Sequence, residues 1–483
     1  MKPILLIHGY SSEGKNNTVK QIYGTLPQDL RKVLGAQVKA LNLSRWISLN
    51  DGITIDDISF AMDRALQSPR YRSLLKTGFN VVIHSTGALV VRNWIKNHSP
   101  KPSPIHNLVH LAGANFGSGL AHIGQGQLSR WGRLIFSGTG RGAMVLKELE
   151  FGSWKTIDMH RHFLEPGNEM FKDYEVQEYC INGSQVPKNL RLVPIRYIKE
   201  DSADTTVRTS ACNLNFNYVT VKPEPKTFSL TQKQVQDLVN QRLDDHPIID
   251  EHYTYETPYA DPDRPRVPFA VAYETAHFGA NIGIVTGSDN RPSVIPLIKK
   301  ALLTPFDTAA YADTAQFFDD QNATTFTKAA KLKWSITEWN KQAQYEGHSQ
   351  LIFRLRDQNG ASVDHFDITI KSHQKKGKNL VNLEDLIEDH HGNKKHPGTI
   401  TYYLRTQEFK SRRFRDVFDR LKTVDVEITA YQPESDDISF VPISLHLTPD
   451  LIATIIKSFQ TTIVDVTLAR LPSRNVFKIT PDQ

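Results

Sequence analysis

The 483-residue chain contains only two cysteines, Cys180 and Cys212, and no apolar run of membrane-spanning length. Two cysteines do not support a disulfide framework, and a transmembrane helix needs about 20 predominantly apolar residues. The apolar stretch in the opening segment MKPILLIHGY has the length of a strand and is too short for a signal peptide. We therefore expect neither a transmembrane helix nor a signal peptide, and a protein that is cytoplasmic or peripherally attached to a membrane. Export by a route without a signal stays open.

Neither hydrophobic nor charged residues dominate the composition, at 39% and 23% of the chain. These values are typical of a globular protein with room for two or more domains, and they exclude a largely disordered chain. The formal net charge is +6, and the segment from Lys371 to Lys422, with 13 basic and 7 acidic residues, accounts for all of it. This segment either forms a solvated face or binds an anionic surface such as a lipid membrane. No nucleic-acid-binding motif accompanies it.

Strand-like and helix-like segments alternate over the first 290 residues or so, which favours a mostly parallel α/β sheet. A helix is predicted at 16–35, with Pro27 as a loop-like residue near its middle. Another is predicted at 54–68, which begins with a threonine cap and early acidic residues. We expect this α/β domain to cover residues 1–310. Its expected strands are 2–8, 37–43, 79–84, 106–114, 190–198 and 267–273.

Two further segments depart from this alternation. Residues 119–166 include GQLSRWGRLIFSGTGRGAMVL and are interpreted either as a lid inserted over the sheet or as a pair of ordinary packing helices. Residues 320–483 alternate apolar and polar residues, and the Asn359-Gly360 dipeptide predicts a hairpin between two strands. We expect this part to be a β-rich, sandwich-like domain that serves membrane association or oligomerisation, and to carry the basic segment.

The segment NVVIHSTGALVVRNW, residues 80–94, places small polar residues between a buried strand and an apolar helix. A sharp strand-to-helix turn strains the backbone, and small residues tolerate it. The G-x-S-x-G nucleophile elbow uses such a turn to present a serine hydroxyl at the end of a parallel sheet. Ile83 replaces the first glycine of that pattern, so the match is partial. Ser85 is the candidate nucleophile.

A serine nucleophile needs an imidazole base and an acid that orients the base. On an α/β-hydrolase sheet these residues follow in the order serine, acid, histidine, each beyond the end of a strand. The segment KEDSADTTVR follows the strand expected at 190–198. Asp204 is the favoured acid, because its D-x-x-V-R sequence resembles the acid loop of bacterial lipases. Glu200 and Asp201 are its competitors.

Three histidines downstream are candidates for the base. His277 follows the strand expected at 267–273 by a short loop, which is where the sheet order puts the base. His252 has no convincing strand before it and is the second choice. His246 is the remaining candidate.

Two backbone N–H groups are expected to stabilise the negative charge that develops on the attacked carbonyl. Thr86, directly after the nucleophile, supplies one, and Tyr10, in the IHGYSS turn, supplies the other. GTGRG at 138–142 follows no strand, and the histidines of MHRHF and DHHGNKKH lack the spacing of a metal site. We therefore expect catalysis to require no metal and no cofactor.

Taken together, LLIHGY, IHSTGALVVR, LAGANFGSGLAH and SADTTVR resemble segments of bacterial α/β-hydrolase lipases. The elbow without its first glycine is most similar to that of the PlaB-type phospholipase A/lysophospholipase A family, as are the length and the β-rich C-terminal part. The chain departs from this family at Ile83, where threonine is usual, and at Thr205, where glycine is usual.

This resemblance implies a serine hydrolase that cleaves the acyl esters of glycerophospholipids and lysophospholipids. It further implies peripheral attachment to a phospholipid membrane, with export to the outer membrane by a signal-less route as an alternative. Self-association into a dimer or tetramer, with NAD(H) at an oligomer interface, is also implied by the resemblance alone.

Two other functions stay open. A soluble carboxylesterase or thioesterase would use the same three residues, with a C-terminal domain that only assembles oligomers. A catalytically silent adaptor would bind lipid or protein through the β-rich domain. Trapping with a fluorophosphonate separates the adaptor from both enzymes, and a comparison of vesicles with short soluble esters separates the two enzymes.

Overall fold

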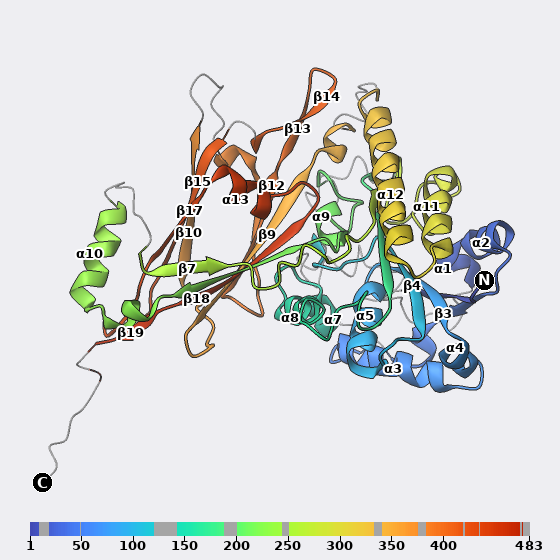
Figure 1. The fold of residues 1–483 in the computed structure, drawn as a ribbon, viewed down its shortest axis with the longest axis horizontal. Coiled ribbons are helices and arrows are strands. Elements are labelled where there is room, and N and C mark those ends of the chain that lie inside the picture. Colours follow the sequence, from blue (N-terminus) through green and yellow to red (C-terminus); the bar gives the residue numbers. More distant parts are fainter. Residues whose placement is uncertain are drawn as a thin grey trace, which may run out of the picture. The chain divides into compact units, whose positions relative to one another are not determined.

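A computed structural model describes most of the chain, in two compact units (Figure 1). The first unit comprises residues 1–215, 261–348 and 408–415, and the second unit comprises 216–260, 349–407 and 416–483. Within the described residues, no helix has the length and apolarity to span a membrane. The described residues are 1–8, 19–48, 50–119, 143–187, 200–243, 251–332, 341–374, 383–418, 421–433, 435–473 and 476.

A six-stranded sheet forms the centre of the first unit. The strands are β1 (Ile4–His8), β2 (Val38–Leu41), β3 (Phe79–His84), β4 (Ile105–Leu111), β5 (Gln177–Asn182) and β8 (Phe269–Val271). Their order is β2-β1-β3-β4-β5-β8, and every neighbouring pair is parallel. This topology confirms the predicted α/β class. The strand expected at 190–198 lies outside the described residues, and β5 was not predicted.

Helices cover this parallel sheet. They are α1 (Val19–Tyr23), α2 (Leu26–Leu34), α3 (Ile55–Gln67), α4 (Arg72–Thr77), α5 (Gly87–His98), α7 (Ala143–Glu148), α8 (Trp154–His162), α9 (Thr209–Cys212), α11 (Arg291–Leu303) and α12 (Thr308–Ala329). On one face, Ile4 and Leu6 share an apolar core with α2, α11 and α12. Helix α5 is buried over most of its length and contacts β3, α3 and α8, which explains its apolar sequence.

Two helix predictions have different outcomes. The helix expected at 16–35 is divided into α1 and α2, because Pro27 lies in the first turn of α2, where a helix needs no N–H donor. Helix α3 begins as predicted: Thr54 and Asp57 cap each other's backbone N–H groups.

The expected insertion at 119–166 is described only in part, because residues 120–142, including GTGRG, lie outside the described residues. The part that follows contains α7 and α8, and α8 packs against α5. For this part, the interpretation as packing helices applies.

The two larger sheets of the second unit share one apolar core. The larger is mixed and contains β11 (Ile387–Gly392), β12 (Thr399–Arg405), β9 (His348–Asp357), β18 (Thr461–Leu468), β6 (Asn217–Pro223) and β7 (Tyr253–Glu256), in this order. The smaller is antiparallel and contains β10 (Phe366–Gln374), β15 (Leu421–Ala430) and β17 (Ile443–Leu447). In a separate two-stranded sheet, β16 (Ile438–Phe440) pairs with β19 (Arg470–Pro472). The α-helices among the described residues of this unit are α10 (Gln232–Leu243) and α13 (Pro449–Ile455). A β-rich C-terminal part was therefore predicted correctly.

The division between the units differs from the boundaries expected at 1–310 and 320–483. Residues 216–260 belong to the second unit, because β6 pairs in parallel with β18 and β7 pairs with β6. Helix α12 continues to Ala329 within the first unit. Because β18 lies more than 200 residues after β6, the local pattern of residues 216–260 does not reveal that the two strands pair.

The hairpin predicted around Asn359-Gly360 is also wrong. The turn itself forms, with the Gly360 amide donating to the carbonyl of Asp357 (2.9 Å), and Val363 briefly pairs back with Leu355. The chain then passes to the other sheet, so that β9 and β10 belong to different sheets. A tight turn fixes the reversal of the chain but not the sheet that the next strand joins.

The basic segment is divided between the two units. Residues 408–415 belong to the first unit and form most of the hairpin of β13 (Gln407–Lys410) and β14 (Arg413–Asp416). The Phe414 ring lies 5.7 Å from that of Phe326 in α12, and the Phe409 amide donates to Glu346 Oε1 (2.6 Å). These contacts anchor the arginines of this hairpin to the first unit rather than to the expected C-terminal domain.

A buried ion pair connects α5 to the sheet. Arg92 of α5 contacts Glu178 of β5 (Nη1 to Oε2, 2.5 Å), and His110 of β4 contacts the same carboxylate (3.1 Å). Burial alone would raise the pKa of Glu178, but Arg92 and His110 outweigh it and lower this pKa to about 2. The carboxylate therefore stays charged in the folded protein at any pH well above 2.

We expect this pair to make the first unit acid-sensitive. The folded pKa of Glu178 lies below its ordinary value of 4.5, so its contribution is complete above pH 4.5 and disappears as the pH falls toward 2. The full contribution is about 3 kcal/mol. In urea unfolding followed at several pH values, the stability difference between the wild type and Glu178→Gln should shrink by about this amount across that range. The exposed Asp313→Asn should show no comparable loss, and a pH-independent difference for Glu178→Gln would contradict the assignment.

Candidate functional site

The predicted sharp turn at Ser85 is present. Ser85 directly follows β3 and has φ = 56°, a left-handed conformation that side-chain-bearing residues adopt rarely. Its amide donates to the carbonyl of Leu111 (3.1 Å), and its own carbonyl accepts from the Ala114 amide (3.3 Å). The loop after β4 therefore holds the turn in its strained conformation.

The structure brings together the three residues that the sequence selected as a catalytic triad. His277 Nε2 lies 3.1 Å from Ser85 Oγ, and His277 Nδ1 lies 2.9 Å from Asp204 Oδ2. All three side chains are buried. An ionised carboxylate only accepts hydrogen bonds, so Nδ1 carries the proton, and Nε2 is the acceptor for the serine hydroxyl.

Backbone groups hold the Asp204 carboxylate. Its Oδ1 accepts from the amides of Thr206 (3.0 Å) and Val207 (2.8 Å), which leaves Oδ2 for the imidazole. The His277 amide also donates to the Asp204 carbonyl (2.8 Å). Of the competing acids, Glu200 is engaged by Arg208 (2.5 Å) instead. Asp204 is thus the acid that reaches His277.

A close backbone approach positions the histidine loop. The Gln185 amide donates to the Thr275 carbonyl (3.0 Å), which joins the segment after β5 to the loop that carries His277. A Cβ atom at Gly183 would lie only 2.1 Å from that carbonyl oxygen. Glycine is therefore required at 183 for this approach, and any side chain there would displace the loop.

His84 is a site neighbour that the sequence analysis missed. Its buried ring lies 4.6 Å from that of His277 and 5.1 Å from that of His8, measured between centroids. Burial, followed by the neighbouring His277 and His8, lowers the pKa of His84 well below 6.5. A neutral His84 does not repel a proton on His277. Its place directly before Ser85 was visible in the sequence, but nothing local indicated its contact with His277.

Among the remaining predicted residues that the structure describes, Thr86 lies next to the triad. Thr86 lies at the start of α5, where backbone N–H groups have no acceptor within the helix. Tyr10 and His246 lie outside the described residues. His252 precedes β7 in the second unit, and its carbonyl accepts from the Glu224 amide (2.8 Å). No group of three or more metal-binding side chains occurs within the described part of the chain.

The backbone at Thr205 shows why glycine is usual at this position of the acid loop. Its φ is 90°, a conformation that glycine adopts freely and that strains a β-branched residue. Relief of this strain is worth about 1–2 kcal/mol, against about 0.5–1 kcal/mol for the greater freedom of glycine in the unfolded chain. We expect Thr205→Gly to raise the free energy of unfolding by up to about 1 kcal/mol, as measured by urea titration. The matched Thr206→Gly, at a residue without positive φ, should destabilise, and equal losses in both variants would contradict the strain argument.

Comparison with known proteins identifies relatives by structure alone. No family profile matches the chain, and no curated protein sequence matches it. Phospholipase PlaB from Legionella pneumophila aligns with 100% of this chain and 97% of its own, with a TM-score of 0.76 and 22% identity. PlaB in complex with thio-NAD aligns over the same shares, with a TM-score of 0.77 and 21% identity. Over its full length, the chain therefore has the fold of PlaB, an α/β-hydrolase with an additional β-rich part.

Proposed function

We propose that the protein is a serine hydrolase that cleaves the acyl esters of glycerophospholipids and lysophospholipids. The observation that carries this proposal is the hydrogen-bonded series from Ser85, directly after β3, through His277 to Asp204. The full-length fold likeness to a phospholipase supports lipid esters as the substrate class.

The proposed first half-reaction forms an acyl-enzyme. Ser85 Oγ attacks the ester carbonyl carbon while His277 Nε2 takes the hydroxyl proton. Asp204 stabilises the imidazolium and keeps the ring in place, because its two amide donors fix the carboxylate. His277 then gives the proton to the leaving alcohol oxygen, and the ester bond to the glycerol breaks.

The second half-reaction releases the fatty acid. Water attacks the acyl-enzyme, His277 takes a proton from that water, and the proton returns to Ser85 as the acyl bond breaks. In both steps the carbonyl oxygen carries negative charge. The Thr86 amide, at the N-terminus of α5, is the donor we propose for it, with Tyr10 as the second donor.

The β13–β14 hairpin supports a membrane-bound substrate. Arg412, Arg413 and Arg415 are exposed, while Phe414 turns to the ring of Phe409. Because residues 408–415 belong to the same unit as Ser85, an anionic lipid surface that binds this hairpin would hold the catalytic unit itself. We therefore propose peripheral attachment to a phospholipid membrane through the first unit.

An oligomer and an NAD(H) site are further proposals from the resemblance. The PlaB structure in complex with thio-NAD supports the idea that such a ligand suits this fold. In this chain, however, the sequence from His8 onward reads HGYSSEG and lacks the G-x-G-x-x-G fingerprint of a dinucleotide-binding sheet. The proposed reaction therefore uses no step through NAD(H).

The triad should act as one unit. We expect Ser85→Ala, His277→Asn and the double variant each to lose about 10⁴-fold or more of kcat on a short soluble ester, with little further loss in the double variant. His252→Asn should retain its activity, and Ser59→Ala provides a buried serine control. If folded Ser85→Ala retained a tenth of the activity, the protein would not be a serine hydrolase.

Vesicles test the membrane proposal separately. A basic residue near an anionic leaflet contributes roughly 1 kcal/mol, so Arg412→Glu, Arg413→Glu and Arg415→Glu together should weaken binding to phosphatidylserine vesicles by about 100-fold at low salt. Sedimentation with vesicles measures this loss, while hydrolysis of a short soluble ester should persist.

The control reverses three exposed basic residues elsewhere in the first unit, Arg64, Arg72 and Lys76. It changes the net charge equally and should bind nearly as the wild type does. Equal weakening by both triple variants would mean that net charge, rather than the hairpin, determines binding.

A further inference from the structure

A cavity of about 770 Å³ lies within the second unit, between its two larger sheets. Protein interiors are close-packed and contain few voids larger than a water molecule. This volume falls instead within the range of about 300–1,000 Å³ that is typical of small-molecule binding sites. The cavity thus has the size of a ligand site rather than of a packing defect.

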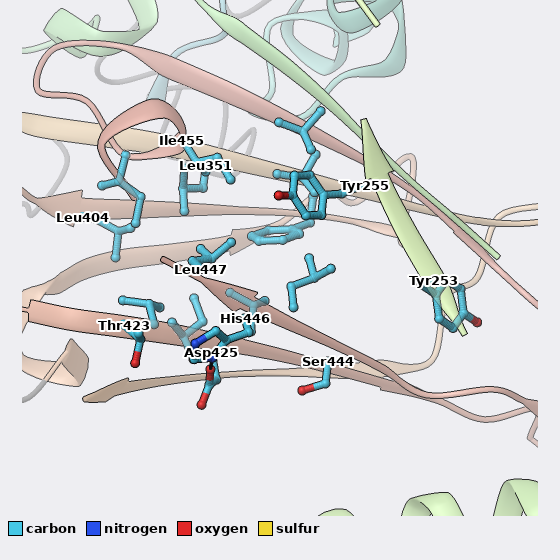
Figure 2. Close-up of a pocket in the computed structure, with 18 of the residues that line it drawn as sticks. Tyr253, Tyr255, Leu351, Leu404, Thr423, Asp425, Ser444, His446, Leu447 and Ile455 are labelled. Atoms are coloured by element: carbon cyan, nitrogen blue, oxygen red, sulfur yellow. Dashed lines mark hydrogen bonds and ion pairs between the residues drawn. The ribbon is translucent and has the colours of Figure 1, made fainter. Parts of the chain in front are cut away.

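The side chains that line the cavity are mostly aliphatic. Figure 2 shows Leu351, Leu404 and Ile455 along one side and Leu447 facing them, and Val464 contributes to the same lining. Leu351 comes from β9 and Leu447 from β17, so both sheets contribute. Such a lining offers dispersion contacts but few hydrogen-bond partners, and it therefore suits a hydrocarbon rather than a peptide or a nucleotide.

Polar groups are confined to the margin of this lining. In Figure 2 the oxygens of Thr423, Asp425 and Ser444 point away from the aliphatic side chains. Asp425 is engaged by His446, with Oδ1 2.6 Å from Nδ1. Lys422 is the only lysine or arginine among the described residues that line the cavity, and it is exposed. The margin therefore offers one cation to an anionic headgroup.

The strand order indicates where the cavity opens. β7 is the last strand of the six-stranded sheet, β17 is the last strand of the three-stranded sheet, and both line the cavity. Tyr255 of β7 is 47% exposed although it belongs to this lining. These two edge strands do not pair with each other, so a ligand that enters beside Tyr255 breaks no strand pair.

We propose that this cavity binds the hydrocarbon chain of a long-chain fatty acid, with its carboxylate at Lys422. An aliphatic interior with a single cation at its margin matches a long chain with a single terminal anion. The site is separate from Ser85, since all of its described lining residues belong to the second unit. The proposal stands independently of the proposed hydrolase activity.

Displacement of a fluorescent fatty acid from the full-length protein by palmitate tests this site. Lys422→Glu should weaken palmitate binding about tenfold, while the exposed Lys395→Glu should not. Leu447→Trp should weaken palmitate binding by narrowing the cavity where the hydrocarbon chain would lie. Laurate, with a shorter chain, should bind about fourfold more weakly for each methylene lost from the cavity. None of these variants should change hydrolysis of a short soluble ester.

Lysophosphatidylcholine, which lacks a free carboxylate, tests whether the site prefers a carboxylate to a phosphocholine headgroup. It should bind more weakly than palmitate to the wild type, and Lys422→Glu should reduce that difference. Palmitate binding that is unaffected by both Lys422→Glu and Leu447→Trp would place the fatty acid elsewhere and overturn the proposal. Equal binding of the two lipids would overturn the assignment of the carboxylate to Lys422. Because binding is measured directly, neither result depends on Ser85 being catalytic.

Discussion

Two hydrogen bonds between Asp204 and His277, one through the side chains and one through the main chain, are the contacts on which the site depends. Ser85 is positioned by its own strand and helix, whereas these two residues lie on loops 73 positions apart. Between them the chain leaves the first unit, contributes β6 and β7 to the second, and returns as β8. The orientation of one imidazole therefore depends on the two ends of a long excursion meeting at Asp204 and His277. The close approach of Gly183 to Thr275 supports the histidine loop from the segment after β5.

The sequence predicted best what short segments determine. The turn at Ser85 and the cap at Thr54 depend on residues within a few positions, and both formed as expected. Asp204 and His277 could be selected because parallel strands place their ends at one edge of the sheet. That rule supplies the order of the residues along the chain. It does not supply the amides of Thr206 and Val207, which hold the carboxylate and became visible only in the structure.

What the sequence did not reveal is the partner of each segment. Residues 216–260 have the same local pattern as other α/β segments, but β6 finds its neighbour in β18. The Asn359-Gly360 turn forms as predicted, and yet the following strand joins another sheet. In the sequence, His84 is only the residue before the nucleophile, whereas in the structure its ring lies beside that of His277. In each case, packing between segments distant in sequence decides among locally equivalent outcomes.

The pairing of β6 with β18 has a consequence for synthesis on the ribosome. The paired residues Asn217 and Thr462 are separated by 245 positions, and at about 5–20 residues per second β6 waits for tens of seconds before its partner emerges. Until then, one hydrogen-bonding edge of β6 lacks its partner strand, and the nascent chain exposes an edge open to mispairing. The segment that joins the acid to the base is thus anchored through β6 only when β18 has left the ribosome. The order of translation therefore delays the anchoring of the segment between Asp204 and His277, whereas the turn at Ser85 needs only residues made much earlier.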